Sequence, residues 1–322
     1  MERRMTWQDR QSFLGEDSEQ RLAEAVVGIA GLGGGNSHVV QQLAHVGIGN
    51  FVLIDEDVIS ITNMNRLIGG TRKDVADETA KTEIMRRMIL AINPEANIQT
   101  CQSIWQLASD SLKPCDLVIG GLDKLRAKDE LDAFCRRFLI PYIDQGMDVH
   151  KLGDRDFLIS GQVMLSAPGG PCLRCLGIVT EQALEEEARA YGDAGGKPQV
   201  VWPNGVLASS AVGIAVSLLT PWYRQTPFSR YLTYDGNTGV TAEGDRLKRW
   251  GSKACAHHED RQVGDPTFDI RRMGAADISC TEVEVTRTAV AVTPTSGSTT
   301  DKDARSLVMR LMTWRPWHVR PK

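Results

Sequence analysis

A run of glycines lies directly between a short apolar strand and a predicted helix, and few folds accommodate that arrangement. The strand is Val26–Ala30, and the run that follows it is Gly-Leu-Gly-Gly-Gly-Asn-Ser at positions 31–37. A helix is then predicted over residues 37–46. Glycines in such a turn let the backbone approach a phosphate, whose charge is stabilised at the N-terminus of the helix. The pattern therefore predicts a nucleotide-binding turn.

Apolar strands and helices continue to alternate along the first half of the chain. Such alternation is typical of a mostly parallel sheet covered by helices on both faces. Beyond about residue 150 the pattern changes to antiparallel strands. We therefore expect an α/β protein with a doubly wound, mostly parallel Rossmann-like sheet that continues into antiparallel strands. The predicted strands are 26–30, 51–55, 117–120, 142–143, 161–167, 230–235 and 239–241, and the predicted helices are 8–24, 37–46, 76–92, 125–138 and 204–219.

The balance of charges argues against nucleic acid and anionic membranes as partners. The chain has 37 Lys and Arg against 41 Asp and Glu, so it carries no overall basic field. The apolar stretch at 205–219 is shorter than the roughly 20 residues that span a bilayer, and we expect a buried helix there. The N-terminus lacks the apolar segment of a secretory signal. We therefore expect a cytoplasmic protein whose seven cysteines stay reduced.

The glycine run has alternative interpretations. A dinucleotide-binding dehydrogenase carries the fingerprint G-x-G-x-x-G, whose last glycine is replaced here by Asn36. A P-loop requires Gly-Lys-Ser or Gly-Lys-Thr, which does not follow the run. A glycine turn that binds no ligand is the remaining alternative.

Charged side chains follow the predicted strands, at the edge of the sheet where ligands bind in such folds. Asp55 ends the second strand, where a carboxylate can accept hydrogen bonds from ribose hydroxyls. Arg66 lies on the loop beyond it, and Lys81 lies in the next predicted helix. Asp123 comes just after a later strand. Two cations that neutralise phosphates and a carboxylate that holds Mg²⁺ predict an ATP site.

These motifs together resemble the ThiF/MoeB and ubiquitin-activating-enzyme superfamily of adenylyltransferases. The resemblance covers about residues 8–260 and rests on five segments. They are DRQSFLGEDSEQRLAEAVVGIAGLGGGNS, FVLIDEDVISITNMNR, DLVIGGLDKLRAKDELDAFC, PCLRC and GVLASSAVGIAVSLL. It implies a ThiF-type adenylation domain over residues 1–262, with a zinc-bearing region at 172–258. Residues 263–322 are then a C-terminal extension, partly disordered or partner-binding.

The resemblance also implies roles for particular residues. The glycine turn binds ATP, Asp55 binds the ribose and Asp123 coordinates Mg²⁺. Arg10, in an Arg-Gln pair near the N-terminus, reaches the phosphates of the partner subunit, which makes the active unit a dimer, expected to be a homodimer. The implied catalytic residues are Arg10, Arg66, Lys81 and Asp123, and the implied nucleotide-binding residues are Gly31, Gly33, Gly34, Asp55, Asn63, Asn65, Arg66, Lys81 and Lys124.

Two positions depart from the pattern of the family. The family usually has Asp-Asn after the strand that leads to the Mg²⁺ ligand, whereas this chain has Asp123-Lys124. Lys124 either adds a phosphate contact or caps a helix. Asn36 stands where the family prefers glycine. We expect ATP binding to survive both changes, because the other phosphate ligands are present.

A C-x-x-C pair supplies half of a tetrahedral zinc site at Cys172 and Cys175. The family completes the site with a second pair, for which this chain offers Cys255 and His258. His257 is the alternative fourth ligand. The other interpretation is that zinc has been lost and that the two cysteines only pack. Cys135, within an apolar helical pattern, is expected in the core, and Cys280 in an exposed tail.

The loop between C-x-x-C and the buried helix lacks a cysteine. Relatives that transfer a carrier protein onto themselves keep one there, but residues 176–254 contain none. A thioester on this loop is therefore excluded. Either a partner attacks the acyl-adenylate directly, or a hydroxyl forms an oxyester, with Thr180, Ser209 and Ser210 as the candidates.

We predict ATP-dependent adenylation of the C-terminal carboxylate of a ubiquitin-like β-grasp protein, for transfer to a conjugating partner. The loop without cysteine and the tail favour a bacterial ubiquitin-like conjugation pathway, with antiviral defence as one role, over sulfur transfer. The basic, aromatic C-terminal end either docks on an acidic partner or is disordered. Adenylation of a sulfur carrier or of a peptide, and dehydration of a tRNA-linked carboxylate, are alternatives. A nicotinamide oxidoreductase and a non-catalytic subunit kept for dimerisation are alternatives of other classes.

Overall fold

A computed structural model describes residues 7–189, 198–223, 229–251, 253–259 and 262–272, together with the backbone of 285–288. The chain divides into two compact units, Met1–Thr288 and Ala289–Lys322. The second unit lies outside the described residues, as does Cys280. Residue 262, where the motifs place the end of the adenylation domain, lies within the first of these units.

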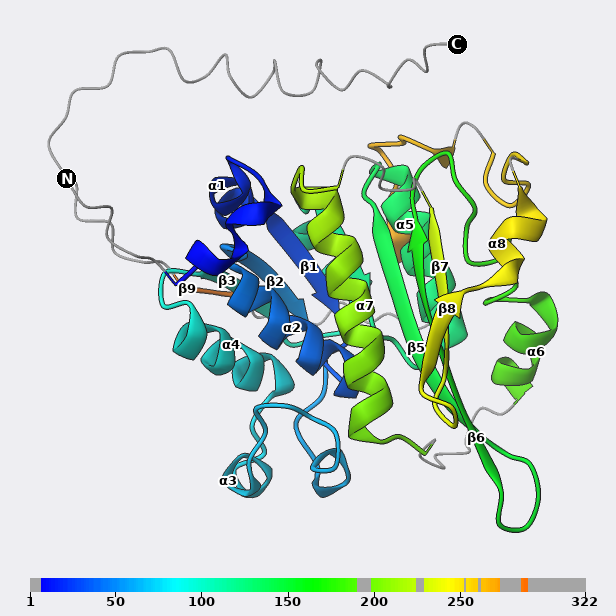
Figure 1. Cartoon of the computed structure of the whole chain (residues 1–322), viewed down its shortest axis with the longest axis horizontal. Coiled ribbons are helices and arrows are strands. Elements are labelled where there is room, and N and C mark those ends of the chain that lie inside the picture. Colours follow the sequence, from blue (N-terminus) through cyan, green and yellow to red (C-terminus); the bar gives the residue numbers. More distant parts are fainter. Residues whose placement is uncertain are drawn as a thin grey trace, which may run out of the picture. The chain divides into compact units, whose positions relative to one another are not determined.

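The described strands form one mixed sheet in the order β8-β7-β6-β5-β4-β1-β2-β3-β9 (Figure 1). Neighbouring strands from β3 across to β5 are parallel, and the strands from β5 to β8 are antiparallel. The predicted α/β class and the change from parallel to antiparallel strands are confirmed. The strands are β1 Val26–Ala30, β2 Asn50–Ile54, β3 Asn97–Cys101, β4 Leu117–Gly120, β5 Tyr142–Lys151, β6 Phe157–Ser166, β7 Arg230–Asp235, β8 Val240–Glu243 and β9 Val285–Thr288.

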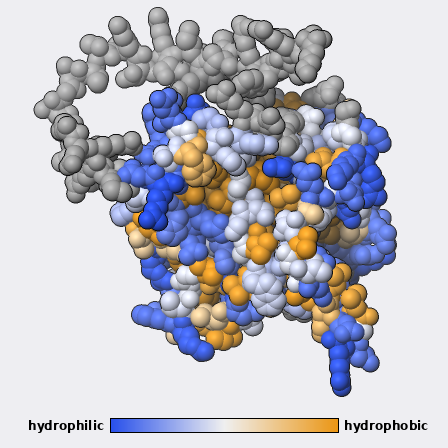
Figure 2. Space-filling view, viewed as in Figure 1, coloured by the Kyte–Doolittle hydropathy of each residue, from blue (hydrophilic) through white to orange (hydrophobic). Residues whose placement is uncertain are grey.

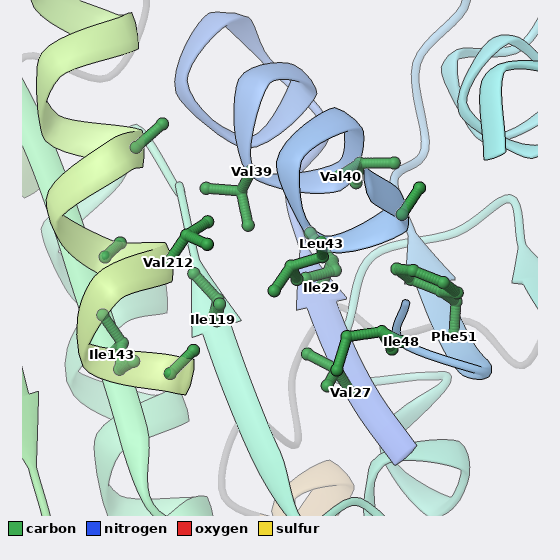
Figure 3. Close-up of a cluster of buried hydrophobic side chains, with 14 of the residues drawn as sticks. Val27, Ile29, Val39, Val40, Leu43, Ile48, Phe51, Ile119, Ile143 and Val212 are labelled. Atoms are coloured by element: carbon green, nitrogen blue, oxygen red, sulfur yellow. The ribbon is translucent and has the colours of Figure 1, made fainter. Parts of the chain in front are cut away.

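Helices cover both faces of this sheet, and α2, α4 and α7 share one face (Figure 1). Figure 3 shows Val39 and Leu43 of α2 and Val212 of α7 packing over Ile29 of β1 and Ile119 of β4. A second apolar cluster on the other face includes residues of α5. The helices are α1 Ser18–Glu24, α2 Gly34–Val46, α3 Arg72–Ala76, α4 Lys81–Ile92, α5 Leu125–Arg137, α6 Glu181–Arg189, α7 Val201–Leu219 and α8 Asp245–Trp250, with 3-10 turns η1 Asp9–Leu14, η2 Ile61–Asn63, η3 Ser109–Leu112 and η5 Ile270–Arg272.

Several element boundaries differ from the sequence prediction. The helix predicted over 8–24 is broken into η1 and α1 at Gly15, whose φ of 121° an L side chain rarely adopts. The strand predicted at 142–143 extends to Lys151, because all ten residues of β5 pair with β6 in an antiparallel ribbon. This ribbon projects beyond the rest of the sheet at the lower edge of Figure 1.

Helix α7 has 19 residues and begins at Val201, before the apolar stretch that predicts it. Pro203 is tolerated because it lies in the first turn, where backbone N–H groups have no partner within the helix. By length and composition α7 could cross a membrane, but half of it is buried inside the protein, against α2, β5 and β6. Figure 2 shows hydrophobic residues next to hydrophilic ones on the face that carries α7.

Part of the extension beyond residue 262 packs on the adenylation domain. Arg137 of α5 forms an ion pair with Asp265 at 3.0 Å, and its guanidinium lies 4.2 Å from the centre of the Phe268 ring. Ile270 is only 2% exposed and joins the apolar cluster around α5. Farther along, β9 pairs antiparallel with β3. These residues therefore extend the first compact unit.

Candidate active site

Two adjoining cavities lie at the carboxyl ends of the parallel strands. The larger, about 380 Å³, extends toward α7 and the β5–β6 ribbon, and the smaller, about 370 Å³, extends toward Asp55 and Trp105. They share five lining residues and so form one elongated site. The shared residues are Gly33, Lys81, Gly121, Leu122 and Asp123.

The glycine turn packs against the backbone just after β4, the neighbouring strand of the sheet, and leaves the start of α2 accessible. A Cβ at Gly31, where φ is 79°, would lie 2.9 Å from the carbonyl oxygen of Gly121. A Cβ at Gly33 would meet nothing within 4 Å. Gly33 is also the N-cap of α2 and supplies no side-chain cap. The free N–H groups of this first turn, with the helix dipole, favour an anion such as a phosphate.

Asp55 is held rigidly behind the glycine turn. Its carboxylate accepts hydrogen bonds from the backbone N–H groups of Leu32 at 2.5 Å and Asp57 at 2.9 Å. Burial raises the pKa of Asp55, against the attraction of Lys81. Asp55 lines the smaller cavity, which is where the predicted ribose contact requires it to be.

Lys81 begins α4 at the junction of the two cavities and is 7% exposed. Its Nζ lies 2.6 Å from Asp57 and 3.6 Å from Asp55. Arg66 lines the larger cavity, and its guanidinium donates to the carbonyl of Thr62 and to the side chain of Asn65. The structure thus brings both predicted phosphate cations to the glycine turn.

The two predicted asparagines differ in their contacts. Asn63 lines the larger cavity, while its Oδ1 accepts from the backbone N–H of Ser60 and so caps η2. Asn65 lines neither cavity. Instead its side chain holds Arg66 and donates to the carbonyl of Gln199. Asn65 is therefore placed to position Arg66 rather than to touch a nucleotide.

Asp123 lines both cavities and has an exposed side chain. Gln199 donates to one of its oxygens at 3.5 Å. A carboxylate next to a phosphate-binding turn fits Mg²⁺, which prefers oxygen ligands and keeps several waters. Lys124 is the N-cap of α5 and lines only the smaller cavity, on the side of Asp55.

Arg10 lies far from the cavities of its own chain. It is an exposed residue of η1, which is attached to the C-terminal end of α2 by the hydrogen bond from Gln11 to the carbonyl of Val46 at 2.9 Å. The glycine turn is at the opposite end of this 13-residue helix, about 20 Å away at 1.5 Å per residue. Arg10 cannot reach the site of its own subunit.

The structure adds polar residues that sequence reasoning missed. Lys128 of α5 lines the larger cavity and donates to both oxygens of buried Asp144, at 2.9 and 3.0 Å. Gln145 of β5 donates to Asn36 in the glycine turn at 2.6 Å. In the sequence, Asp144 and Gln145 directly follow the short apolar strand predicted at 142–143, and that signal could have identified them.

Four side chains gather into a metal-binding geometry beside α5. The Sγ atoms of Cys172 and Cys175 are 3.6 Å apart, and Cys255 Sγ lies 3.5 Å from Cys175 Sγ. His257 Nδ1 is 3.5 and 3.4 Å from the first two sulfurs. A tetrahedron of Zn–S bonds has edges of about 3.8 Å, so these donors suit Zn²⁺. Burial raises the pKa of Cys175, which disfavours its thiolate in the absence of a cation.

The prediction of His258 as the fourth ligand is corrected: His257 joins the three cysteines. His258 instead lies with Asp132 and Cys172. Its half-buried ring has a lowered pKa because burial disfavours the charged form. Two consecutive residues of a loop point in different directions, and spacing alone does not show which one turns toward the sulfurs.

The cysteine turn is held from inside by a buried network. Asp132 accepts from the backbone N–H of Leu173 at 2.8 Å and pairs with Arg136 at 3.1 Å. Arg136 also donates to the carbonyls of Gly170 and Pro171. Helix α5 thereby positions the Cys172 turn. Cys135 of the same helix is fully buried, as predicted.

The hydroxyls proposed as nucleophiles make local contacts instead. Thr180 Oγ1 accepts from the backbone N–H of Ala183 at the start of α6. Ser209 and Ser210 donate to carbonyls four residues earlier in α7. None of the three lines either cavity, whereas Ser160 of β6 lines the larger one.

Comparison with known proteins identifies relatives among curated sequences. The chain is 36% identical over 138 residues to tRNA threonylcarbamoyladenosine dehydratase of Escherichia coli (strain K12), covering 41% of this chain and 50% of that protein. It is 26% identical over 226 residues to the sulfur carrier protein ThiS adenylyltransferase of the same strain, covering 69% of this chain and 82% of that protein. The chain therefore spans about half the length of the dehydratase.

Solved structures show the same fold. E. coli MccB with ATP superposes with a TM-score of 0.60 at 19% identity, covering 75% of this chain and 71% of that one. In sequence, residues 7–249 match the family described as the ThiF family. Because that match spans well over half of the chain, the protein belongs to the ThiF family.

Proposed function

We propose that this protein is an ATP-dependent adenylyltransferase that activates the C-terminal carboxylate of a ubiquitin-like β-grasp protein. The observation that supports this most directly is the elongated site itself. The glycine turn, Lys81 and Asp123 lie where its two cavities meet. A nucleotide in the smaller cavity would present its phosphates at that junction. A carboxylate would enter through the larger cavity.

The reaction forms an acyl-AMP and releases pyrophosphate. The substrate carboxylate attacks the α-phosphorus of ATP and needs no protein base, because it is already ionised at pH 7. Arg66 and Lys81 neutralise phosphate charge, and the glycine turn positions the phosphates. Mg²⁺ held by Asp123 would stabilise charge on the phosphate oxygens.

We further propose a homodimer in which Arg10 of each subunit completes the site of the other. Arg10 is exposed and cannot reach its own glycine turn. Phe13 of η1 and Trp222 remain 69% and 44% exposed, with ring centres 6.2 Å apart. Exposed aromatic residues are enriched at protein interfaces. The exposed aromatic pair therefore offers a contact surface close to Arg10.

The cluster of Cys172, Cys175, Cys255 and His257 is proposed to bind structural Zn²⁺. Four protein ligands leave no open position for catalysis. The metal would join the turn after β6 to the segment after α8 and so fix one wall of the domain.

The absence of a cysteine from the loop before α7 supports direct transfer of the acyl group to a conjugating partner. We propose a bacterial ubiquitin-like conjugation pathway, with a role in antiviral defence, as its setting. Adenylation of a sulfur carrier is the second candidate. It is favoured by the 82% coverage of the ThiS adenylyltransferase.

Intact-mass analysis tests the proposal. The protein is incubated with ATP, Mg²⁺ and a ubiquitin-like protein that ends in Gly-Gly, or with the same protein carrying a C-terminal amide. A mass gain of one AMP on the free-acid form alone is expected. An adduct on the enzyme that hydroxylamine releases would indicate an oxyester, for which Ser160 is the first residue to map. No change on any β-grasp or sulfur-carrier protein would exclude the proposed substrate class.

A further inference from the structure

Gln145 of β5 carries a buried acceptor to which none of the described residues donates. The residue is 3% exposed and lines the larger cavity. Its Oε1 has no hydrogen-bond partner among the residues that the structure describes, although the Nε2 of the same amide is bonded to Asn36. Buried polar atoms are usually paired, so an orphan beside a cavity points to a donor that arrives with a ligand.

The orientation of the Gln145 amide follows from backbone groups that can only accept. Asn36 Nδ2 donates to the carbonyls of Ala30 at 3.2 Å and Gly31 at 2.7 Å. Asn36 therefore presents its Oδ1 to Gln145. Because Oδ1 can only accept, the Gln145 amide donates to it through Nε2, at 2.6 Å. This leaves Oε1 as the unpaired atom.

Gln145 lies against the first turn of α2. A Cβ at Gly35 would come within 3.2 Å of Gln145 Nε2 and 3.5 Å of Asn204 Oδ1. The α-phosphate and the reacting carboxylate must meet beside this turn. Both groups only accept hydrogen bonds, so neither satisfies Oε1. In a peptide, the N–H of the last residue lies one carbon away from its carboxylate.

We propose that Gln145 Oε1 accepts a hydrogen bond from the amide N–H of the substrate's C-terminal residue. The site thereby selects a carboxylate with a neighbouring N–H, as at the end of a polypeptide, over carboxylates that lack one. Asn36, which replaces the family's glycine, holds the Gln145 amide in the required orientation. This inference rests on the proposed function, since it concerns the substrate of the same adenylation site.

The test uses two synthetic heptapeptides that differ in one atom. One ends in glycine, and the other ends in glycolate, whose ester oxygen replaces the N–H. ATP–pyrophosphate exchange gives kcat/KM for each peptide. A site that hydrogen-bonds a substrate group strongly rejects an analogue that lacks the group. We therefore expect the kcat/KM of the wild type to be roughly 10- to 100-fold higher for the glycine peptide than for the glycolate peptide.

Gln145→Leu should lose most of the activity toward the glycine peptide. Its kcat/KM values for the glycine and glycolate peptides should be equal. Because the ratio is measured within one variant, partial misfolding does not affect it. Gln162→Leu is the matched control, since Gln162 lines the same cavity on the neighbouring strand, and it should keep the wild-type preference. The ratio separates a binding role from a merely structural one.

The outcomes separate the two proposals. Equal exchange with both peptides in the wild type, or an unchanged preference in Gln145→Leu, would overturn the role of Gln145 and leave adenylation standing. Exchange with neither peptide would overturn the inferred selection of a peptide-type end, whereas adenylation of a folded β-grasp protein stands or falls on the intact-mass test.

Discussion

Lys81 Nζ lies 2.6 Å from Asp57 Oδ2 at the junction of the two cavities. The ion pair holds the nearly buried Lys81 side chain beside the glycine turn, where a bound phosphate could replace Asp57 as its anionic partner.

Lys81→Met should therefore lower pyrophosphate exchange by roughly 10²- to 10³-fold, because one preorganised charge is lost while the apolar stem is kept. Lys73→Met is the control, since Lys73 pairs with Asp77 on the exposed surface of α3. Exchange rates measured at saturating ATP distinguish the two variants. Equal rates for both would refute the assignment of Lys81.

Asp123→Ala should abolish exchange without unfolding the protein. The side chain is exposed and contributes no core contact, so thermal melting should change little. Titration with Mg²⁺ in the Asp123→Asn variant checks the metal role, and a large rise in the Mg²⁺ requirement is expected. Wild-type exchange in either variant would contradict the magnesium assignment.

Mixing two inactive variants should restore activity if Arg10 acts across a dimer. In a homodimer of either variant, Arg10→Ala or Lys81→Met, both active sites lack one of the two cations and are inactive. A mixed dimer contains one site with an intact Arg10 and an intact Lys81, so up to a quarter of wild-type activity should return after subunit exchange. Light scattering gives the oligomeric state, and a monomer or an absence of recovery would argue against the shared site.

His257→Ala should reduce bound zinc, whereas His258→Ala should retain it, because only His257 joins the three sulfurs. Elemental analysis of the two purified variants measures the difference directly. The melting temperature with and without a chelator supplies a second readout. The chelator should lower the melting temperature of the wild type and of His258→Ala. His257→Ala should have a low melting temperature even without the chelator. If zinc is lost only from His258→Ala, His258 is the fourth ligand, as the spacing of the motif predicts.

Arg87→Met should destabilise the protein at neutral pH by about 1–2 kcal/mol. The Arg87 guanidinium beside Asp74 holds the pKa of that buried carboxyl well below its usual range. A lowered folded-state pKa contributes stability above the unfolded value, and that stability is lost as pH falls through the folded value. The difference in unfolding free energy between variant and wild type should therefore shrink below about pH 4. Arg86→Met, next to half-exposed Glu83, is the control and should show little pH-dependent difference.

The fold and the nucleotide end of the site were predictable because their signals are local. Each predicted strand that leads to the site is a short apolar run, and parallel strands bring their carboxyl ends to one edge. Asp55 and Asp123 therefore line one cavity although they are 68 positions apart in the sequence. The glycine turn needs only its own backbone to present N–H groups to an anion.

The sequence by itself determined the α/β class, most strands of the sheet, the glycine turn and the residues at the strand ends, because periodicity and residue type constrain the backbone locally. The pattern did not predict β3, Asn97–Cys101, which pairs with β2. Only the tertiary structure decided which side chains meet across the chain. Asn36 and Gln145 are 109 positions apart, and His257 rather than His258 turns toward Cys172. Such pairings depend on strand register and loop direction, which packing of the whole domain settles and no local pattern encodes.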